Sequence, residues 1–162
     1  MYYRFGKVFF FLTVLLFVFA FLYTYSALPE RVGFAQEDDG SVVAEASKST
    51  FFYIGILAFG LLNALLAFPA KMIEKQSTSD LKRLFPNGDI HTDYLLAWMY
   101  SFVGVVNISL SIMCLFVHSI NNQNEIGTSS FSFFFYLVPV LFVVWIIALF
   151  WILLQKFKSI KK

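Results

Sequence analysis

The chain has 162 residues, of which 59% are apolar and 14% are charged, and its mean hydropathy is +0.75. A typical soluble domain is about 45–50% apolar and about 25% charged, so this composition excludes a soluble globular domain. The single cysteine, Cys114, excludes an intrachain disulfide and a zinc site built of cysteines. A net charge of +2 is too small to predict nucleic-acid binding.

Four segments are long and apolar enough to cross a membrane, which takes about 20 residues of helix. They cover residues 8–28, 51–70, 94–118 and 131–154. The first resembles a secretory signal in following Arg4 and Lys7, but its apolar run is long and Tyr25-Ser26-Ala27 makes a poor cleavage site. We therefore predict an all-α membrane protein with a single four-helix domain over residues 1–162.

The basic residues predict the orientation of these spans. Ten of the 12 Lys and Arg residues lie in the two tails or in the loop at 71–93, whereas the loop at 29–50 is acidic. Because basic loops stay on the cytoplasmic side, both termini and the 71–93 loop are predicted to be cytoplasmic. Six of these cations are expected to contact anionic lipid headgroups: Lys71, Lys75, Lys82, Arg83, Lys156 and Lys158.

The predicted extracytoplasmic loop at 29–50 contains two short stretches that alternate apolar and small or polar residues, separated by Asp39-Gly40. This pattern predicts a β-hairpin with a tight turn. An isolated hairpin is only marginally stable, so we expect it to pack on the helix ends or on a partner. The residues expected to make outer contacts are Arg31, Phe34, Asp38, Asp39 and Gly40. Ser47 or Ser49 is the expected N-cap of the second span.

The cytoplasmic loop at 71–93 contains signals for a short helix. Residues 77–80 offer caps for an amphipathic turn at 81–85, and Pro86-Asn87-Gly88 ends it. Thr92 or Asp93 is then the expected cap of the third span.

Small and polar residues follow one face of the third span at steps of three and four, which predicts a helix-packing seam. They are Tyr100, Gly104, Asn107, Ser111, Cys114 and His118. The second span carries a matching set: Gly60, Asn63, Ala64 and Ala67. We predict that this seam joins the two spans or contacts a neighbouring subunit, with Asn63 paired to Asn107. A ligand-lining groove is the alternative.

The remaining residues favour no catalytic centre. His91 and His118 flank the third span and are predicted on opposite membrane faces, so they cannot share a metal ion or a haem. The sequence contains no convergent Ser–His–Asp set and no phosphate-binding glycine loop. Charged residues are absent from the middle of each span, where proton-coupled transporters carry them. We therefore expect no enzymatic activity, no cofactor and no metal.

Three stretches, Leu28–Val32, Asp39-Gly40 and Ser47–Phe51, carry a family resemblance. Over residues 10–70 the chain resembles the small domain of unknown function found at the N-terminus of SdpI-like bacterial immunity and signalling proteins. The chain departs from that pattern at Phe34–Gln36, where the family often has His-Phe, and at Val42-Val43, where it has Asp. The resemblance implies a bacterial cytoplasmic membrane and an outer loop that contacts something outside.

These observations favour a non-catalytic accessory or structural subunit of a larger bacterial inner-membrane complex. Its expected partners are the lipid bilayer and other membrane subunits, without nucleic acid or metal. Two alternatives remain: an SdpI-like immunity or signal-sensing protein, and a small permease or channel component.

Overall fold

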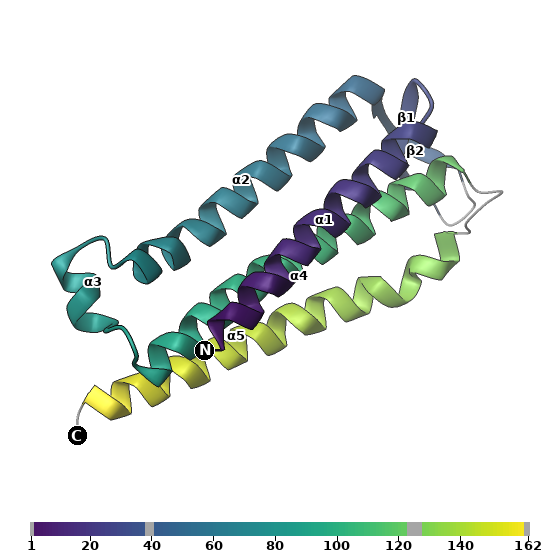
Figure 1. Cartoon of the computed structure of the whole chain (residues 1–162). Coiled ribbons are helices and arrows are strands. Elements are labelled where there is room, and N and C mark those ends of the chain that lie inside the picture. Colours follow the sequence, from purple (N-terminus) through teal and green to yellow (C-terminus); the bar gives the residue numbers. More distant parts are fainter. Residues whose placement is uncertain (1, 38–40, 123–127, 161–162) are drawn as a thin grey trace.

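A computed structural model describes residues 2–37, 41–122 and 128–160 (Figure 1). These residues form five α-helices, a two-stranded sheet and one 3-10 turn. The elements are α1 (Tyr3–Ala27), β1 (Arg31–Gln36), β2 (Val42–Ser47), α2 (Lys48–Lys75), α3 (Ser79–Leu84), α4 (Ile90–Asn121), η1 (Thr128–Phe131) and α5 (Ser132–Ile160).

Helices α1, α2, α4 and α5 are each long and apolar enough to cross a membrane, which confirms the four predicted spans. Their length and composition identify the chain as an integral membrane protein. The helices run past the predicted apolar segments, and α2 and α4 include charged residues in their terminal turns. The start of α1 and the end of α5 lie at the same end of the bundle as α3 (Figure 1). We call this end the α3 end, and the opposite one the hairpin end.

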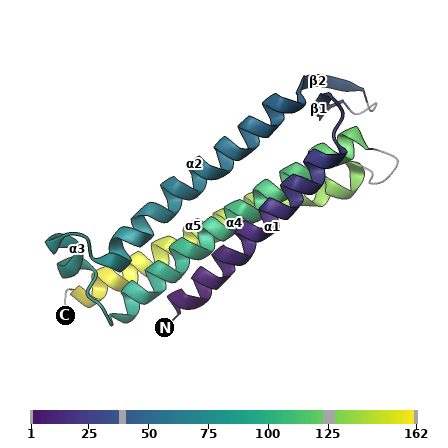
Figure 2. The same ribbon diagram turned by 45° about the horizontal axis from the view of Figure 1, so that its top comes forward.

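Helix α4 is the centre of the bundle, and α1, α2 and α5 all pack against it. Figure 2 shows α1 running beside α4 along most of its length. Glycines permit this close approach. A Cβ atom added to Gly6 would lie 2.7 Å from the Ala97 carbonyl oxygen, and one added to Gly104 would lie 2.5 Å from the Phe9 ring. Because membrane helices associate by close packing, these two glycines hold α1 against α4.

Helix α2 contacts the rest of the bundle at both ends and at one central point. Ala67, Ala70 and Ile73 are buried towards the α3 end. Towards the hairpin end, Phe59 stacks on Phe17 with ring centroids 4.2 Å apart. Most of the remaining surface of α2 is exposed and apolar, as lipid-facing helix surfaces are.

The helix caps match the sequence in two places and differ in one. Ser47 accepts a hydrogen bond from the Thr50 N–H and caps α2, and Thr78 caps α3 in the same way. The predicted cap of α4 at Thr92 or Asp93 is wrong, because Asp89 accepts the N–H groups of His91 and Thr92. The break at 86–88 is short enough for the helix to begin directly after Asp89.

The predicted hairpin between α1 and α2 is present, with β1 and β2 antiparallel. Arg31 pairs with Ser47, Gly33 with Glu45, Ala35 with Ala44 and Gln36 with Val42. This register skips Phe34 on β1 and Val43 on β2, so each strand carries one β-bulge.

Candidate functional site

The hairpin is fixed to the end of α4 by a side-chain amide. The Gly33 N–H donates to Asn121 Oδ1 at 2.9 Å, and Asn121 Nδ2 donates to the Gly33 carbonyl at 2.8 Å. Val32 is fully buried in this contact. A Cβ atom on Gly33 would lie 2.8 Å from Val42 and 3.3 Å from Ile120, so only glycine fits here without displacement. The hairpin therefore packs on a helix end, as the sequence predicts.

The bulges of this hairpin place apolar side chains on its surface. Phe34 is 48% exposed and Val43 is 56% exposed, and the adjacent Val42 is also exposed. A bulge redirects the side chain of its extra residue. We call Phe34, Val42 and Val43 the hairpin patch. Among the other predicted contact residues, Arg31 is exposed and lies 4.0 Å from Glu45. Asp38, Asp39 and Gly40 lie outside the described residues.

The predicted polar contact between the second and third spans is confirmed. Asn63 Nδ2 donates to Asn107 Oδ1 at 2.8 Å, and Asn107 Nδ2 donates to Asn63 Oδ1 at 3.0 Å. Asn107 is fully buried, and Ala67 is buried on the same side of α2. These four hydrogen-bonding groups are thereby satisfied within the apolar bundle.

The rest of the predicted seam is arranged differently. Gly60 and Ala64 are exposed, and no atom lies within 4 Å of a Cβ placed on Gly60. Three residues along a helix correspond to a rotation of about 300°, so these two lie about 60° from Asn63 and Ala67 around α2. On α4, Gly104 and Cys114 contact α1, since Phe9 covers Gly104 and Thr24 donates to the Cys114 carbonyl at 3.2 Å. Ser111 donates within α4 to the Asn107 carbonyl.

The α1 face of this seam was missed by sequence reasoning. Its buried residues recur at steps of seven, four, three and four, which is the spacing of one helix face. They are Gly6, Thr13, Phe17, Ala20 and Thr24, and Phe21 beside them is also buried. Four of them are small or hydroxyl residues within a run of Phe, Leu and Val. That contrast is the signal that could have predicted this contact.

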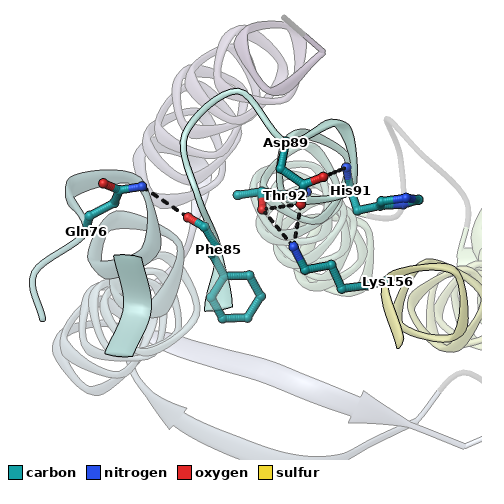
Figure 3. Close-up of polar contacts among 6 residues, drawn as sticks. All are labelled: Gln76, Phe85, Asp89, His91, Thr92 and Lys156. Carbon is teal, nitrogen blue, oxygen red and sulfur yellow. Dashed lines mark hydrogen bonds and ion pairs between the residues drawn. The ribbon is translucent and has the colours of Figure 1, made fainter. Parts of the chain in front are cut away.

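At the α3 end, Lys156 joins α5 to the start of α4 (Figure 3). Its ammonium pairs with the Asp89 carboxylate and lies 3.5 Å from the Thr92 hydroxyl. Lys156 is only 8% exposed, so it does not project to lipid headgroups as expected. The centroid of the Phe85 ring lies 5.7 Å from this ammonium. Gln76 Nε2 donates a hydrogen bond to the Phe85 carbonyl. The apolar end of α3 thus shields the ion pair.

Asp89 is the charged centre of that contact. Its partial burial opposes ionisation and raises the pKa, but hydrogen bonds from Lys156, Thr92 and the His91 N–H outweigh this effect. The resulting pKa is about 2, below the ordinary value of 3.8. Asp89 therefore remains charged and paired throughout the physiological range.

A second ionic cluster joins three helices near the same end. Lys7 from α1 pairs with Glu74 from α2, whose other carboxylate oxygen accepts the Tyr100 hydroxyl from α4 at 2.8 Å. Lys71 and Lys75 lie beside this cluster and are exposed. The remaining predicted headgroup cations, Lys82, Arg83 and Lys158, are also exposed. Arg83 lies 3.9 Å from Asp80 on the same short helix.

The described residues contain no group of three or more His, Cys, Asp or Glu side chains that could hold a metal ion. His91 lies in the first turn of α4, and His118 is fully buried near its other end, against the Tyr23 ring at 4.9 Å. Comparison of the chain with protein-family models, curated proteins and solved structures found no match.

Proposed function

We propose that the chain is a non-enzymatic subunit of a bacterial inner-membrane complex, and that the hairpin patch binds another subunit. The observation that carries this proposal is the pair of bulges at Phe34 and Val43. Each bulge exposes an apolar side chain on a hairpin that Asn121 holds in place. Exposed apolar groups on an ordered support are typical of protein interaction sites.

The surface of α2 supports the same proposal. Gly60 and Ala64 form a small-residue pair that no other part of the described chain covers. Such pairs let a second helix approach closely within the membrane. The hairpin patch and this pair lie on consecutive elements, because α2 begins directly after β2.

The orientation proposed for this subunit places the hairpin outside the cell and the α3 end in the cytoplasm. Its support is the concentration of lysine and arginine at the α3 end, in the tails and in the 71–93 loop. The proposed partner surface is therefore extracytoplasmic.

A photocrosslinking amino acid placed at each bulge tests this function. In cells of the source organism, a probe at Phe34 or Val43 should form a covalent adduct with one membrane protein. Leu84 on α3 is 46% exposed and apolar, and it supplies a matched control position at the opposite end. Adducts equal at all three positions, or absent at the bulges, would contradict the proposal.

Signal sensing by an SdpI-like protein is the second candidate, and Arg31 favours it. The Arg31 side chain is 87% exposed, and its 4.0 Å contact with Glu45 is a weak surface pair. Both charges are therefore available to a peptide ligand. Substituting Arg31→Gln should abolish peptide resistance or signalling and leave copurification with other subunits intact. Loss of copurification with no loss of resistance would instead favour the subunit function.

A further inference from the structure

The ionic cluster of Lys7, Glu74 and Tyr100 borders a cavity between α1, α2 and α4. The cavity has a volume of about 480 Å³ and is lined by Lys7, Phe10, Lys71, Glu74, Lys75 and Tyr100. It lies at the α3 end, where α2 approaches the start of α1. The lining thus combines four charged groups with two aromatic rings.

The charges around this cavity do not balance. Glu74 is neutralised by Lys7, and its second oxygen is occupied by the Tyr100 hydroxyl. Among the residues that the structure describes, no carboxylate forms an ion pair with Lys71 or Lys75. Both of these lysines are exposed. The three lysines of the lining therefore carry two positive charges in excess of its single carboxylate.

Helix α2 places both of those charges in the lining of the cavity. Lys71 and Lys75 are four residues apart, which places them on the same helix face, one turn apart. Glu74 shares this face and anchors Lys7 from the opposite wall. Lysine ammonium groups arranged in this way suit a phosphate, which accepts several charge-assisted hydrogen bonds. Phe10 and Tyr100 add an apolar wall next to the cations.

We propose that this cavity binds one phosphate group, with Lys71 and Lys75 as its direct ligands. Glu74 positions the Lys7 ammonium on the opposite wall of the cavity. This is a discrete site with one ligand per chain, in contrast to the diffuse headgroup contacts of a basic loop. The phosphate belongs either to an anionic lipid headgroup or to a soluble phosphate compound. The proposal is independent of the hairpin patch and of any partner subunit.

Native mass spectrometry of the full chain in detergent tests the site. With dioleoyl phosphatidylglycerol, one lipid should bind per chain, more tightly than dioleoyl phosphatidylcholine, whose choline cancels the phosphate charge. Substituting Lys71→Gln and Lys75→Gln together should weaken phosphatidylglycerol binding by about tenfold to thirtyfold. Both lysines are exposed and unpaired in the described chain, so the variant should fold; each single variant is measured as well.

The matched control removes the same charge elsewhere, through Lys82→Gln and Arg83→Gln on α3. This variant should bind phosphatidylglycerol as the wild type does. Titration with inorganic phosphate, followed by thermal unfolding, distinguishes the two sources, because stabilisation by phosphate without lipid identifies a soluble ligand. Equal loss of binding in both double variants would overturn the proposal, as would the absence of both lipid binding and phosphate stabilisation.

Discussion

At the scale of single residues, two pairs of polar side chains join helices of the bundle. The two amides of Asn63 and Asn107 satisfy each other across α2 and α4, and Asp89 with Lys156 joins α4 to α5. In an apolar medium, removal of one partner takes from the other its hydrogen bond across the two helices, and the polar atom left without that bond carries most of the energetic cost. Each pair therefore fixes the position of one helix.

Replacing Asn63 or Asn107 with Leu should destabilise the bundle by about 1–2 kcal/mol. The double substitution should cost less than the sum of the two single ones, because it leaves no orphaned amide. Thermal unfolding in detergent measures this cycle. Leu61→Ala is a suitable control, since Leu61 is 55% exposed. Strict additivity would show that the two amides act independently.

Acidification should destabilise the contact between α4 and α5. The pKa of Asp89 is lower in the folded chain, about 2, than its ordinary value of 3.8. Its charged form therefore stabilises the fold by about 2 kcal/mol at neutral pH, and this contribution disappears as the pH falls from about 4 towards 2. Unfolding of the wild type and of Asp89→Asn, measured over that range, should converge at low pH.

The exposed Asp80 provides the comparison for this measurement. Its side chain is 78% exposed, so the Asp80→Asn variant should keep the pH dependence of the wild type. If Asp89→Asn shows that same dependence, other carboxylates are responsible for the acid sensitivity.

At the scale of elements, glycine decides which helix faces meet. Gly6 lies against the backbone of α4, whereas Gly60 on α2 faces open space. Both residues occupy helices of similar length and composition, so the sequence alone does not separate a packing glycine from a lipid-facing one.

The substitution Gly6→Ala should destabilise the chain by about 1–3 kcal/mol, because its Cβ would meet the immobile Ala97 carbonyl oxygen. Gly60→Ala is the matched control and should be neutral or stabilising by about 0.5–1 kcal/mol, since alanine favours helix. Thermal unfolding of both variants in detergent measures the difference. If Gly60→Ala is the more harmful substitution in native membranes but not in detergent, Gly60 contacts a partner helix.

At the scale of the whole molecule, the two ends of the bundle differ in chemistry. The hairpin end presents an apolar patch on a small sheet, and the α3 end gathers ion pairs and exposed lysines. This difference underlies the proposed orientation, with the basic end in the cytoplasm.

Cysteine labelling of intact cells tests the orientation. A cysteine replacing the half-exposed Glu45 should react with a membrane-impermeant maleimide, and one replacing Lys82 should react only after permeabilisation. The native Cys114 is buried and should remain unlabelled. Labelling in the reverse order would invert the topology and move the hairpin patch to the cytoplasm.

Local pattern predicted the four spans, the hairpin, two caps and the Asn63–Asn107 contact, because each depends on hydropathy, turn residues or helix periodicity. Local pattern could not predict which helix each face contacts. The small residues of α1 are hidden among bulky apolar ones, and Gly60 has the same spacing signal as a packing glycine. Lys156 and Asp89 are 67 residues apart, so their pairing depends on how α5 docks.

The Asn121 side chain has one more consequence, for the edges of the sheet. Its amide occupies both the N–H and the carbonyl of Gly33, groups that would otherwise be open to another strand. At Gly33 the outer edge of β1 is thus capped by a side-chain amide, which offers the same donor and acceptor as a peptide group. Uncapped strand edges promote unwanted pairing between copies of a protein. A strand added along β1 would therefore have to displace this amide, which favours addition along β2, next to the start of α2.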